Sequence, residues 1–135
     1  MQYKPLEGLN ILASGRGDAH VIVRRDNGDE YFIPLETVCV LGDRKGKVYG
    51  ELLANSVIDD GQGDVLQRLF DNREIVELEI RIGALGNNRP HHVYVFKNCV
   101  LTEYKLIVDD PVKRRFRFRC IRSRLLLYWM KLLRR

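Results

Sequence analysis

The segment from Glu74 to Ile82 constrains the fold most, because its apolar and charged residues alternate from Val76 onward. Successive side chains of a β-strand point to opposite faces of a sheet. Val76 and Leu78 therefore share one face, and Glu77 and Glu79 share the other. This period of two predicts a strand that is buried on one side and charged on the other.

Further strands of the same kind follow. His92–Phe96 and Asn98–Val108 come after a turn at 86–90, and an acidic turn at Asp109–Pro111 leads into Val112–Ile121. Arginine alternates with phenylalanine in the last of these strands, which again separates a charged face from an apolar one. Antiparallel ribbons with charged faces predict a mainly β protein, either an antiparallel β-barrel or a sandwich. Because no catalytic motif is present, the sequence favours a structural role over an enzymatic one.

Shorter elements are expected in the first third of the chain. Leu6–Ala13 is a weak first strand that ends at the glycine-rich stretch Ser14–Gly17. Asp18–Arg25 and Glu30–Pro34 flank the pair Asn27-Gly28, a strong hairpin signal because both residues tolerate positive φ. The sequence therefore predicts a turn at Ser14–Gly17 and a hairpin after it.

The middle of the chain predicts one short helix laid on a β core. After the apolar stretch Thr37–Leu41, the polar and glycine-rich Gly42–Lys47 is expected to be an exposed loop. Tyr49–Ile58 fits either a strand or a short helix, which periodicity does not separate. Asp64 is well placed as the N-cap of a helix over Val65–Asn72, whose apolar residues form one stripe.

The C-terminal extension, residues 122–135, is basic and apolar. Ser123 could cap a second helix that runs to Leu133. Four interpretations stay open: a core or interface helix, a continuation of the last strand, a membrane-surface helix, and a nucleic-acid-binding arm. The whole chain of 135 residues is expected to form a single domain that needs no metal or disulfide to fold.

Charge narrows the class of function only weakly. The formal net charge is +5, with much of the excess between Lys113 and Arg135. This permits contact with nucleic acid but does not identify it. The alternating segment Arg115–Arg119 would suit a base-stacking platform only if arginines and phenylalanines shared a face, and on a strand they do not. Its phenylalanines are therefore expected in the core.

No residue pattern predicts an active site or a cofactor. Glu77 and Glu79 could act as paired acids in glycoside hydrolysis, but ion pairing with the arginines of Val112–Ile121 is the simpler interpretation. The cysteines and histidines lack zinc-ligand spacing, so no metal is expected. An N-terminus without the apolar core of a signal peptide, and no apolar run of membrane-spanning length, predict cytosolic synthesis and no membrane anchor.

The order of elements resembles that of bacteriophage tail tube proteins, whose fold is shared with the haemolysin-coregulated protein of type VI secretion. Val93–Asp110 followed by Val112–Cys120 is similar to their C-terminal half. That half has a strand ending in Phe and a small polar residue, a strand with a Tyr, an acidic turn, and a Phe-rich last strand. By element order the resemblance covers residues 18–121, and the C-terminus after Arg122 departs from it.

The resemblance implies a six-membered ring in which each subunit contributes strands to a continuous inner β-barrel. Stacked rings would form a hollow tube that conducts DNA without sequence-specific binding. Partners would be further copies of the chain, the tail sheath and the baseplate, and the protein would lie in the tail of a virion assembled in the host cytoplasm. We expect the tube to belong to a contractile-tailed phage. A closely related possibility is the tube of a secretion system or of a phage-derived particle. A monomeric basic β-barrel that binds nucleic acid is the alternative, and a small enzyme ranks third.

The resemblance also gives two sets of charged residues an expected role. A channel for DNA should not present a net basic wall, because each cation that touches phosphate adds affinity. The candidates for the wall are Glu77, Glu79 and Arg81. Residues 42–58 are expected to project as a loop that contacts the neighbouring ring. The charged candidates in that loop are Asp43, Arg44, Lys45 and Lys47.

A third expectation concerns the three cysteines. Three thiols cannot all pair within one chain, and a released virion meets oxidising surroundings. If any cysteine is bridged, the bond is therefore expected to join subunits, through Cys39, Cys99 or Cys120.

Overall fold

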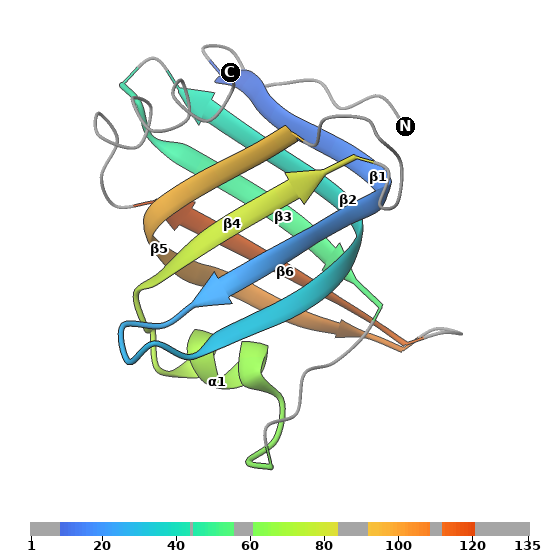
Figure 1. Cartoon of the computed structure of the whole chain (residues 1–135), viewed down its shortest axis with the longest axis vertical. Coiled ribbons are helices and arrows are strands. Elements are labelled where there is room, and N and C mark those ends of the chain that lie inside the picture. Colours follow the sequence, from blue (N-terminus) through green and yellow to red (C-terminus); the bar gives the residue numbers. More distant parts are fainter. Residues whose placement is uncertain (1–8, 44, 56–60, 84–91, 109–111, 121–135) are drawn as a thin grey trace.

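One antiparallel sheet of six strands, with one short helix, makes up most of the described chain in the computed structural model (Figure 1). The structure describes residues 9–43, 45–55, 61–83, 92–108 and 112–120. The expectation of a mainly β, antiparallel chain with one short helix is confirmed. The elements are β1 (Leu9–Arg24), β2 (Glu30–Asp43), β3 (Val48–Ala54), α1 (Val65–Asp71), β4 (Val76–Ile82), β5 (His92–Ile107) and β6 (Lys113–Cys120).

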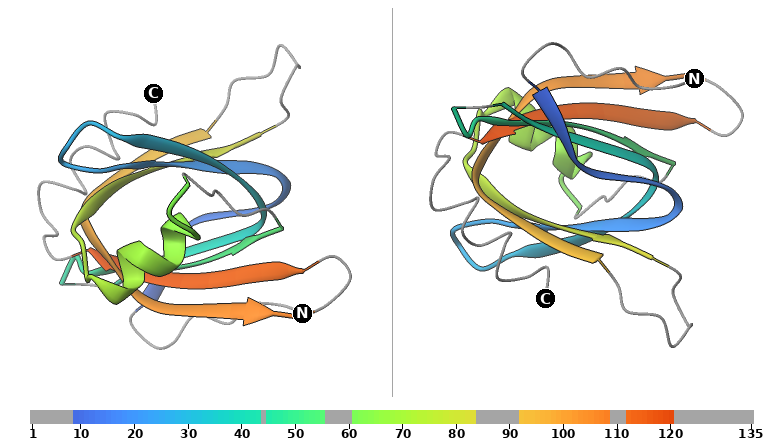
Figure 2. Two further views of the ribbon diagram at one scale, coloured as in Figure 1. Left: turned by 90° about the horizontal axis from the view of Figure 1, so that it is seen from below. Right: turned by 90° about the horizontal axis from the view of Figure 1, so that it is seen from above.

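Each strand has two hydrogen-bonded neighbours, in the order β1-β2-β3-β6-β5-β4, and β4 pairs back with β1. Strands that are adjacent in the sequence form four of the six pairings. The β3–β6 and β1–β4 pairings join segments that lie far apart in the chain. The curved sheet surrounds a common interior, and α1 lies at one end of it (Figure 2).

The interior is filled by the apolar side chains that alternate along the strands. Phe96, Phe116 and Phe118 are among the largest fully buried residues, and the rings of Phe96 and Phe118 lie 5.9 Å apart between centroids. Burying a phenylalanine contributes about 2 to 3 kcal/mol. The expectation that the phenylalanines of the last strand belong to the core is confirmed.

Phe118 packs directly over the backbone of Gly50, its register partner on β3. A Cβ atom at Gly50 would lie 2.1 Å from Cε1 of that ring, which real structures do not show. The ring and the backbone therefore cannot keep this arrangement if position 50 carries a side chain.

β1 runs without interruption through Ser14–Gly17, so the turn expected there is wrong. The register with β2 shifts between Arg16 and Ala19, and Gly17 has φ of 87°. This combination is a β-bulge, which bends a strand without ending it. The hairpin at Asn27-Gly28 is confirmed, with φ of 93° at the glycine and the Gly28 amide donating to the Arg25 carbonyl.

β5 likewise joins two strands that the sequence suggested were separate. Asn98 has φ of 55°, in the left-handed region that asparagine tolerates better than most residues. The register with β4 shifts at the same point, since Leu78 pairs with Phe96 but Val76 pairs with Cys99. The strand bends at this bulge and continues to Ile107.

The projecting loop expected over residues 42–58 is wrong. β2 extends to Asp43 and β3 begins at Val48, so only a tight turn separates them. The Asp43 amide donates to the Lys47 carbonyl at 2.9 Å, and the Lys47 amide donates to Asp43 Oδ1 at 2.8 Å. Gly46, with φ of 81°, supplies the left-handed residue. Lys45 and Lys47 are exposed at this turn, whereas Arg44 lies outside the described residues.

The segment after the turn is a strand because its residues alternate in burial. Val48, Leu52 and Ala54 are fully buried, while Tyr49 and Glu51 face outward. The strand pairs with β2 on one side and β6 on the other. Deleting Asp43–Lys47 would therefore remove the connection between two core strands rather than shorten a projecting loop.

Asp64 begins α1, as the sequence predicts, and also fixes the helix to the sheet. Its Oδ1 accepts hydrogen bonds from the amides of Leu66 and Gln67. Its Oδ2 accepts a hydrogen bond from the Tyr104 hydroxyl and lies 3.5 Å from Nε of Arg114. The helix stripe is buried as expected, by Val65, Leu66 and Leu69. The second helix expected over Ser123–Leu133 lies outside the described residues.

Replacing Asp64 with alanine should destabilise the protein by about 2 to 3 kcal/mol, because the substitution removes both the cap and the acceptor for Tyr104. Urea unfolding followed by circular dichroism would measure the change. Asp71→Ala, at the exposed end of the same helix, is the matched control and should cost less than about 0.5 kcal/mol. Equal effects of the two substitutions would contradict the role assigned to Asp64.

Stability should fall in alkaline solution through Tyr104. Burial, followed by the hydrogen bond to Asp64, raises the pKa of Tyr104 from 10 to about 12. The folded state therefore holds this proton more tightly than the unfolded state does. The corresponding stability is fully present below pH 10 and is lost as the pH rises toward 12. Unfolding midpoints of the wild type and Tyr104→Phe should converge over that range, and midpoints that stay equally far apart up to pH 12 would contradict this role of Tyr104.

Candidate functional site

The outward face of β4 carries the three candidates for a channel wall, Glu77, Glu79 and Arg81. Arg24 on β1 reaches across to this face and donates from Nη1 to Glu77 Oε2 at 3.0 Å and to Glu79 Oε1 at 3.1 Å. Arg81 Nε donates to Glu79 Oε2 at 2.6 Å. The expected ion pairing of these carboxylates is therefore present, but not with the expected partners on the last strand.

Glu79 is buried on the outward face, with only 8% of its surface exposed. It lies between Ile22 on β1 and Val95 on β5. Burial alone would raise its pKa, but hydrogen bonds from Arg81 and Arg24 outweigh burial and hold the pKa of Glu79 below its usual value. Of the three wall candidates, Glu77 and Arg81 are thus the ones with substantial exposed surface.

Ion pairs on this face join equal numbers of acids and bases, which we call the β4 charge network. Beyond the contacts already given, Arg24 Nε lies 3.4 Å from Glu30, and Lys97 Nζ lies 3.8 Å from Glu77. The network comprises the carboxylates of Glu30, Glu77 and Glu79 and the cations of Arg24, Arg81 and Lys97. Its formal charges cancel, so this part of the face carries no net charge.

The arginines of β6 form a second set of ion pairs on the same outward face of the sheet, across β3, β6 and β5. Arg115 lies 3.5 Å from Glu51 on β3 and 3.9 Å from Glu103 on β5. Arg117 lies 3.7 Å and 3.4 Å from the same two carboxylates. Each arginine is therefore shared between its two neighbouring strands. Cross-strand pairs of this kind add modestly to sheet stability.

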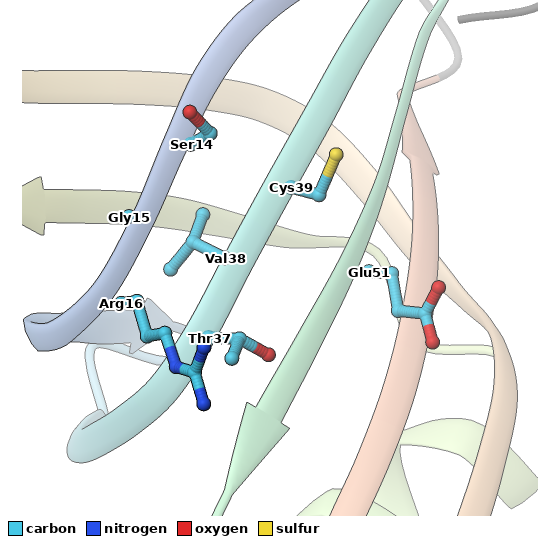
Figure 3. A pocket seen from close by; sticks show the side chains of 7 residues that line it. All are labelled: Ser14, Gly15, Arg16, Thr37, Val38, Cys39 and Glu51. Carbon is cyan, nitrogen blue, oxygen red and sulfur yellow. The ribbon is translucent and has the colours of Figure 1, made fainter. Parts of the chain in front are cut away.

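A surface pocket of about 530 Å³ lies over β1, β2 and β3 (Figure 3). Ser14, Cys39 and Glu51 are register partners on the three strands, so their side chains follow one another across it. Gly15 contributes only backbone, and a Cβ atom there would lie 2.7 Å from Cγ2 of Ile82. The pocket is lined by Ser14, Gly15, Arg16, Thr37, Val38, Cys39 and Glu51. The lining presents one thiol and two hydroxyls, those of Cys39, Ser14 and Thr37. Glu51 is the one carboxylate among these lining residues, and it already contacts Arg115 and Arg117.

Two of the three cysteines do not lie where a bond between subunits would need them. Cys99 and Cys120 are buried in the core, with 0% and 5% exposed, and their Sγ atoms lie 3.0 Å apart. Both occupy inward-facing strand positions, so neither can reach another chain while the sheet is intact. This corrects the expectation for these two residues. Cys39, on the wall of the pocket, is partly exposed.

The part of the chain that the structure describes holds neither a cluster of metal ligands nor a helix that could span a membrane. Among those residues, no group of three or more His, Cys, Asp or Glu side chains is placed to hold a metal ion. Within the same residues, no helix has the length and hydrophobicity needed to cross a bilayer. His92 is exposed at the start of β5, and His91 lies outside the described residues.

Comparison with protein-family models and with curated proteins finds no match. Function therefore has to be argued from the strands, their edges and their charged faces.

Sequence reasoning placed the charged side chains on the correct face of β4 but missed Arg24 and Lys97 as their partners. Both belong to other strands, and their position depends on pairing register. The signal that could have found Arg24 is the alternation of Val21 and Val23 with Ile22 and Arg24, which places Arg24 on the face opposite the two valines. Nothing in the sequence indicated which strand would lie beside it.

Replacing Glu79 with glutamine should destabilise the protein by about 2 kcal/mol at pH 7, because two charge-assisted hydrogen bonds are lost in a buried position. Since the folded-state pKa of Glu79 is lowered, its contribution is present above its ordinary pKa of 4.5 and is lost as the pH falls further. Denaturant titrations at several pH values should therefore show the two proteins converging in acid. Glu103→Gln, in an exposed ion pair, is the control and should cost less than about 1 kcal/mol at pH 7.

Proposed function

We propose that this chain is the subunit of a tail tube, a structural protein whose copies join into rings that stack into a hollow conduit for DNA. The resemblance described above motivates the proposal. The structural observation that carries it is an edge of β5 that no described strand covers.

The edge lies in the second half of β5. β4 pairs with β5 from His92 to Cys99, whereas β6 pairs with it from Cys99 to Ile107. Glu103–Ile107 consequently has β6 on one side and, among the described residues, no strand on the other. Arg73 donates from Nη1 to the Leu101 carbonyl at 3.1 Å, where the β4 pairing has ended. The ends of β5 and β6 run side by side away from β4 (Figure 2).

An edge of this kind is suited to pairing with another chain. Exposed strand edges present unpaired amides and carbonyls, which proteins either protect or use for assembly. The end of this hairpin is also apolar, with Leu106 48% and Val108 85% exposed. Adding a strand from a neighbouring subunit would satisfy the backbone groups and cover these side chains.

A second uncovered edge lies on β1. Ala13–Arg16 pairs with β2, and the pairing of β1 with β4 spans Ala19–Arg24. No other described strand reaches the β4 side of Ala13–Arg16. A subunit that offers one edge and accepts at another makes a head-to-tail contact, and such contacts close into a ring when the rotation allows. The number of six subunits comes from the resemblance and not from these strands.

The β4 charge network suits the wall of a DNA conduit. A neutral face binds phosphate weakly, because few counterions are released when DNA approaches it. Glu77 and Arg81 are the residues of this network that we propose to face the channel. Glu79 holds Arg81 directly and is joined to Glu77 through Arg24. The β2–β3 turn, with Lys45 and Lys47, takes the place of the longer loop as the proposed contact between rings.

The alternative of a nucleic-acid-binding barrel gains no support from the alternating Arg and Phe of β6. Phe116 and Phe118 are buried, so they cannot stack on bases. Arg115 and Arg117 are engaged by Glu51 and Glu103 on the neighbouring strands. Contacts with a sheath and a baseplate, and a place in a virion tail, remain predictions of the tube proposal.

Replacing Leu106 with glutamate should abolish assembly while leaving the fold intact, because a charge at the β5 edge opposes pairing with another chain. Light scattering and electron microscopy of the purified protein would measure assembly, and circular dichroism would report the fold. Ile75→Glu is the matched control, since Ile75 is 45% exposed and lies outside the β5 edge.

Rings or tubes should form with the wild type and with Ile75→Glu but not with Leu106→Glu. A wild type that stays monomeric at high concentration, with DNA affinity that falls steeply with salt, would overturn the proposal in favour of the binding protein. Assembly by Leu106→Glu equal to that of the wild type would show that the β5 edge is not the contact.

A further inference from the structure

We propose that Cys99 and Cys120 form an intrachain redox site, in which a low-molecular-weight disulfide oxidises the two thiols to a bond that joins β5 to β6 inside the core. The inference rests on the position of these two residues and is independent of the tube proposal.

The geometry already brings the two sulfurs into contact. Cys99 and Cys120 are directly opposite each other in the antiparallel register of β5 and β6. Their Sγ atoms lie 3.0 Å apart in the buried interior. A disulfide has a sulfur–sulfur distance of about 2 Å, so forming the bond requires the two side chains to approach by about 1 Å. No rearrangement of the strand pairing is needed.

The two thiols differ in access, which gives the reaction an order. Cys99 is fully buried, donates to the Phe96 carbonyl at 3.3 Å, and has a pKa raised by burial and by the neighbouring Cys120 thiol. Cys120 is the last residue of β6 and retains a small exposed surface. Strand ends open more readily than strand centres. Cys120 is therefore the attacking thiol and Cys99 the resolving one.

The exchange proceeds in two balanced steps. The Cys120 thiolate attacks one sulfur of the small disulfide, forms a mixed disulfide and releases one small thiol. The Cys99 thiolate then attacks the Cys120 sulfur, forms the internal bond and releases the second small thiol. The protein loses two protons and two electrons, and the small disulfide is reduced to two thiols. Cytosolic thiol buffers favour the reduced form, and surroundings outside a cell favour the bond.

Cys39 provides an internal comparison. It lies on β2, at the wall of the surface pocket, away from the β5–β6 pair. Being partly exposed, it should form a mixed disulfide or a bond to a second chain rather than join the internal pair. Removing it isolates the reaction of the other two thiols.

The test uses the full chain with Cys39→Ser, incubated with 2-hydroxyethyl disulfide at pH 8. Intact-mass spectrometry should show the loss of two hydrogen atoms, and denatured samples should show no remaining free thiol. Peptide mapping should find one linked pair that contains Cys99 and Cys120. The oxidised protein should melt on the order of 10 °C higher than the reduced protein, because the bond limits the unfolded chain.

Two further variants on the Cys39→Ser background test the order of attack. Cys99→Ser should accumulate the mixed disulfide at Cys120, because the resolving thiol is missing. Cys120→Ser should leave Cys99 unmodified on the same timescale, because Cys99 is inaccessible in the folded chain. Both variants keep a small polar side chain, and circular dichroism would confirm that they fold.

Three results would overturn the proposal. One is that both thiols of the Cys39→Ser protein remain free after prolonged incubation, and another is a stable mixed disulfide with no internal bond. The third is a linked species joining two chains, which would return the buried cysteines to a role between subunits. Faster modification at Cys99 than at Cys120 would reverse the assigned order and with it the argument from strand opening.

Discussion

The contact between the Phe118 ring and the bare backbone of Gly50 is the constraint on which the rest of the sheet depends. It holds β6 against β3, and the same ring contacts Phe96 on β5. β6 is therefore fixed from both sides at one residue. Because β3 and β6 are distant in the chain, this packing joins the hairpins of the first half to the hairpin of the second. A glycine partner for a large aromatic side chain is a known way of filling a sheet without overpacking it.

Because Phe96, Phe116 and Phe118 point into the interior, the charged residues of the same strands lie on the outer face. There they form ion pairs with residues of neighbouring strands. Arg24 and Arg81 contact the carboxylates of β4, and Arg115 and Arg117 contact those of β3 and β5. On these described faces the arginines are thus matched locally by acids. The net charge of +5 for the whole chain therefore overstates how basic these faces are.

Most of the fold that could be predicted from the sequence came from the alternation of apolar and charged residues along single strands. It assigned the inward faces of β4 and β6 correctly, and the Asp64 cap and the helix stripe followed from local rules. It failed where a bulge replaced a turn, because glycine at Gly17 and asparagine at Asn98 permit either outcome. It also could not identify partners, since contacts such as Cys99 with Cys120 depend on register between strands.

The strand order has a consequence for how the chain reaches its native state. β1 is the first strand that the structure describes, yet one of its edges is paired only when Ala19 meets Ile82 on β4. Likewise, one edge of β3 stays unpaired until β6, the last described strand, has been synthesised. Pairings between distant segments are slow because a long loop must be closed before any contact compensates for the lost entropy. During translation the β1–β2–β3 segment is therefore an incomplete sheet with two open edges, and it is at that stage, rather than after folding, that the chain is most exposed to aggregation.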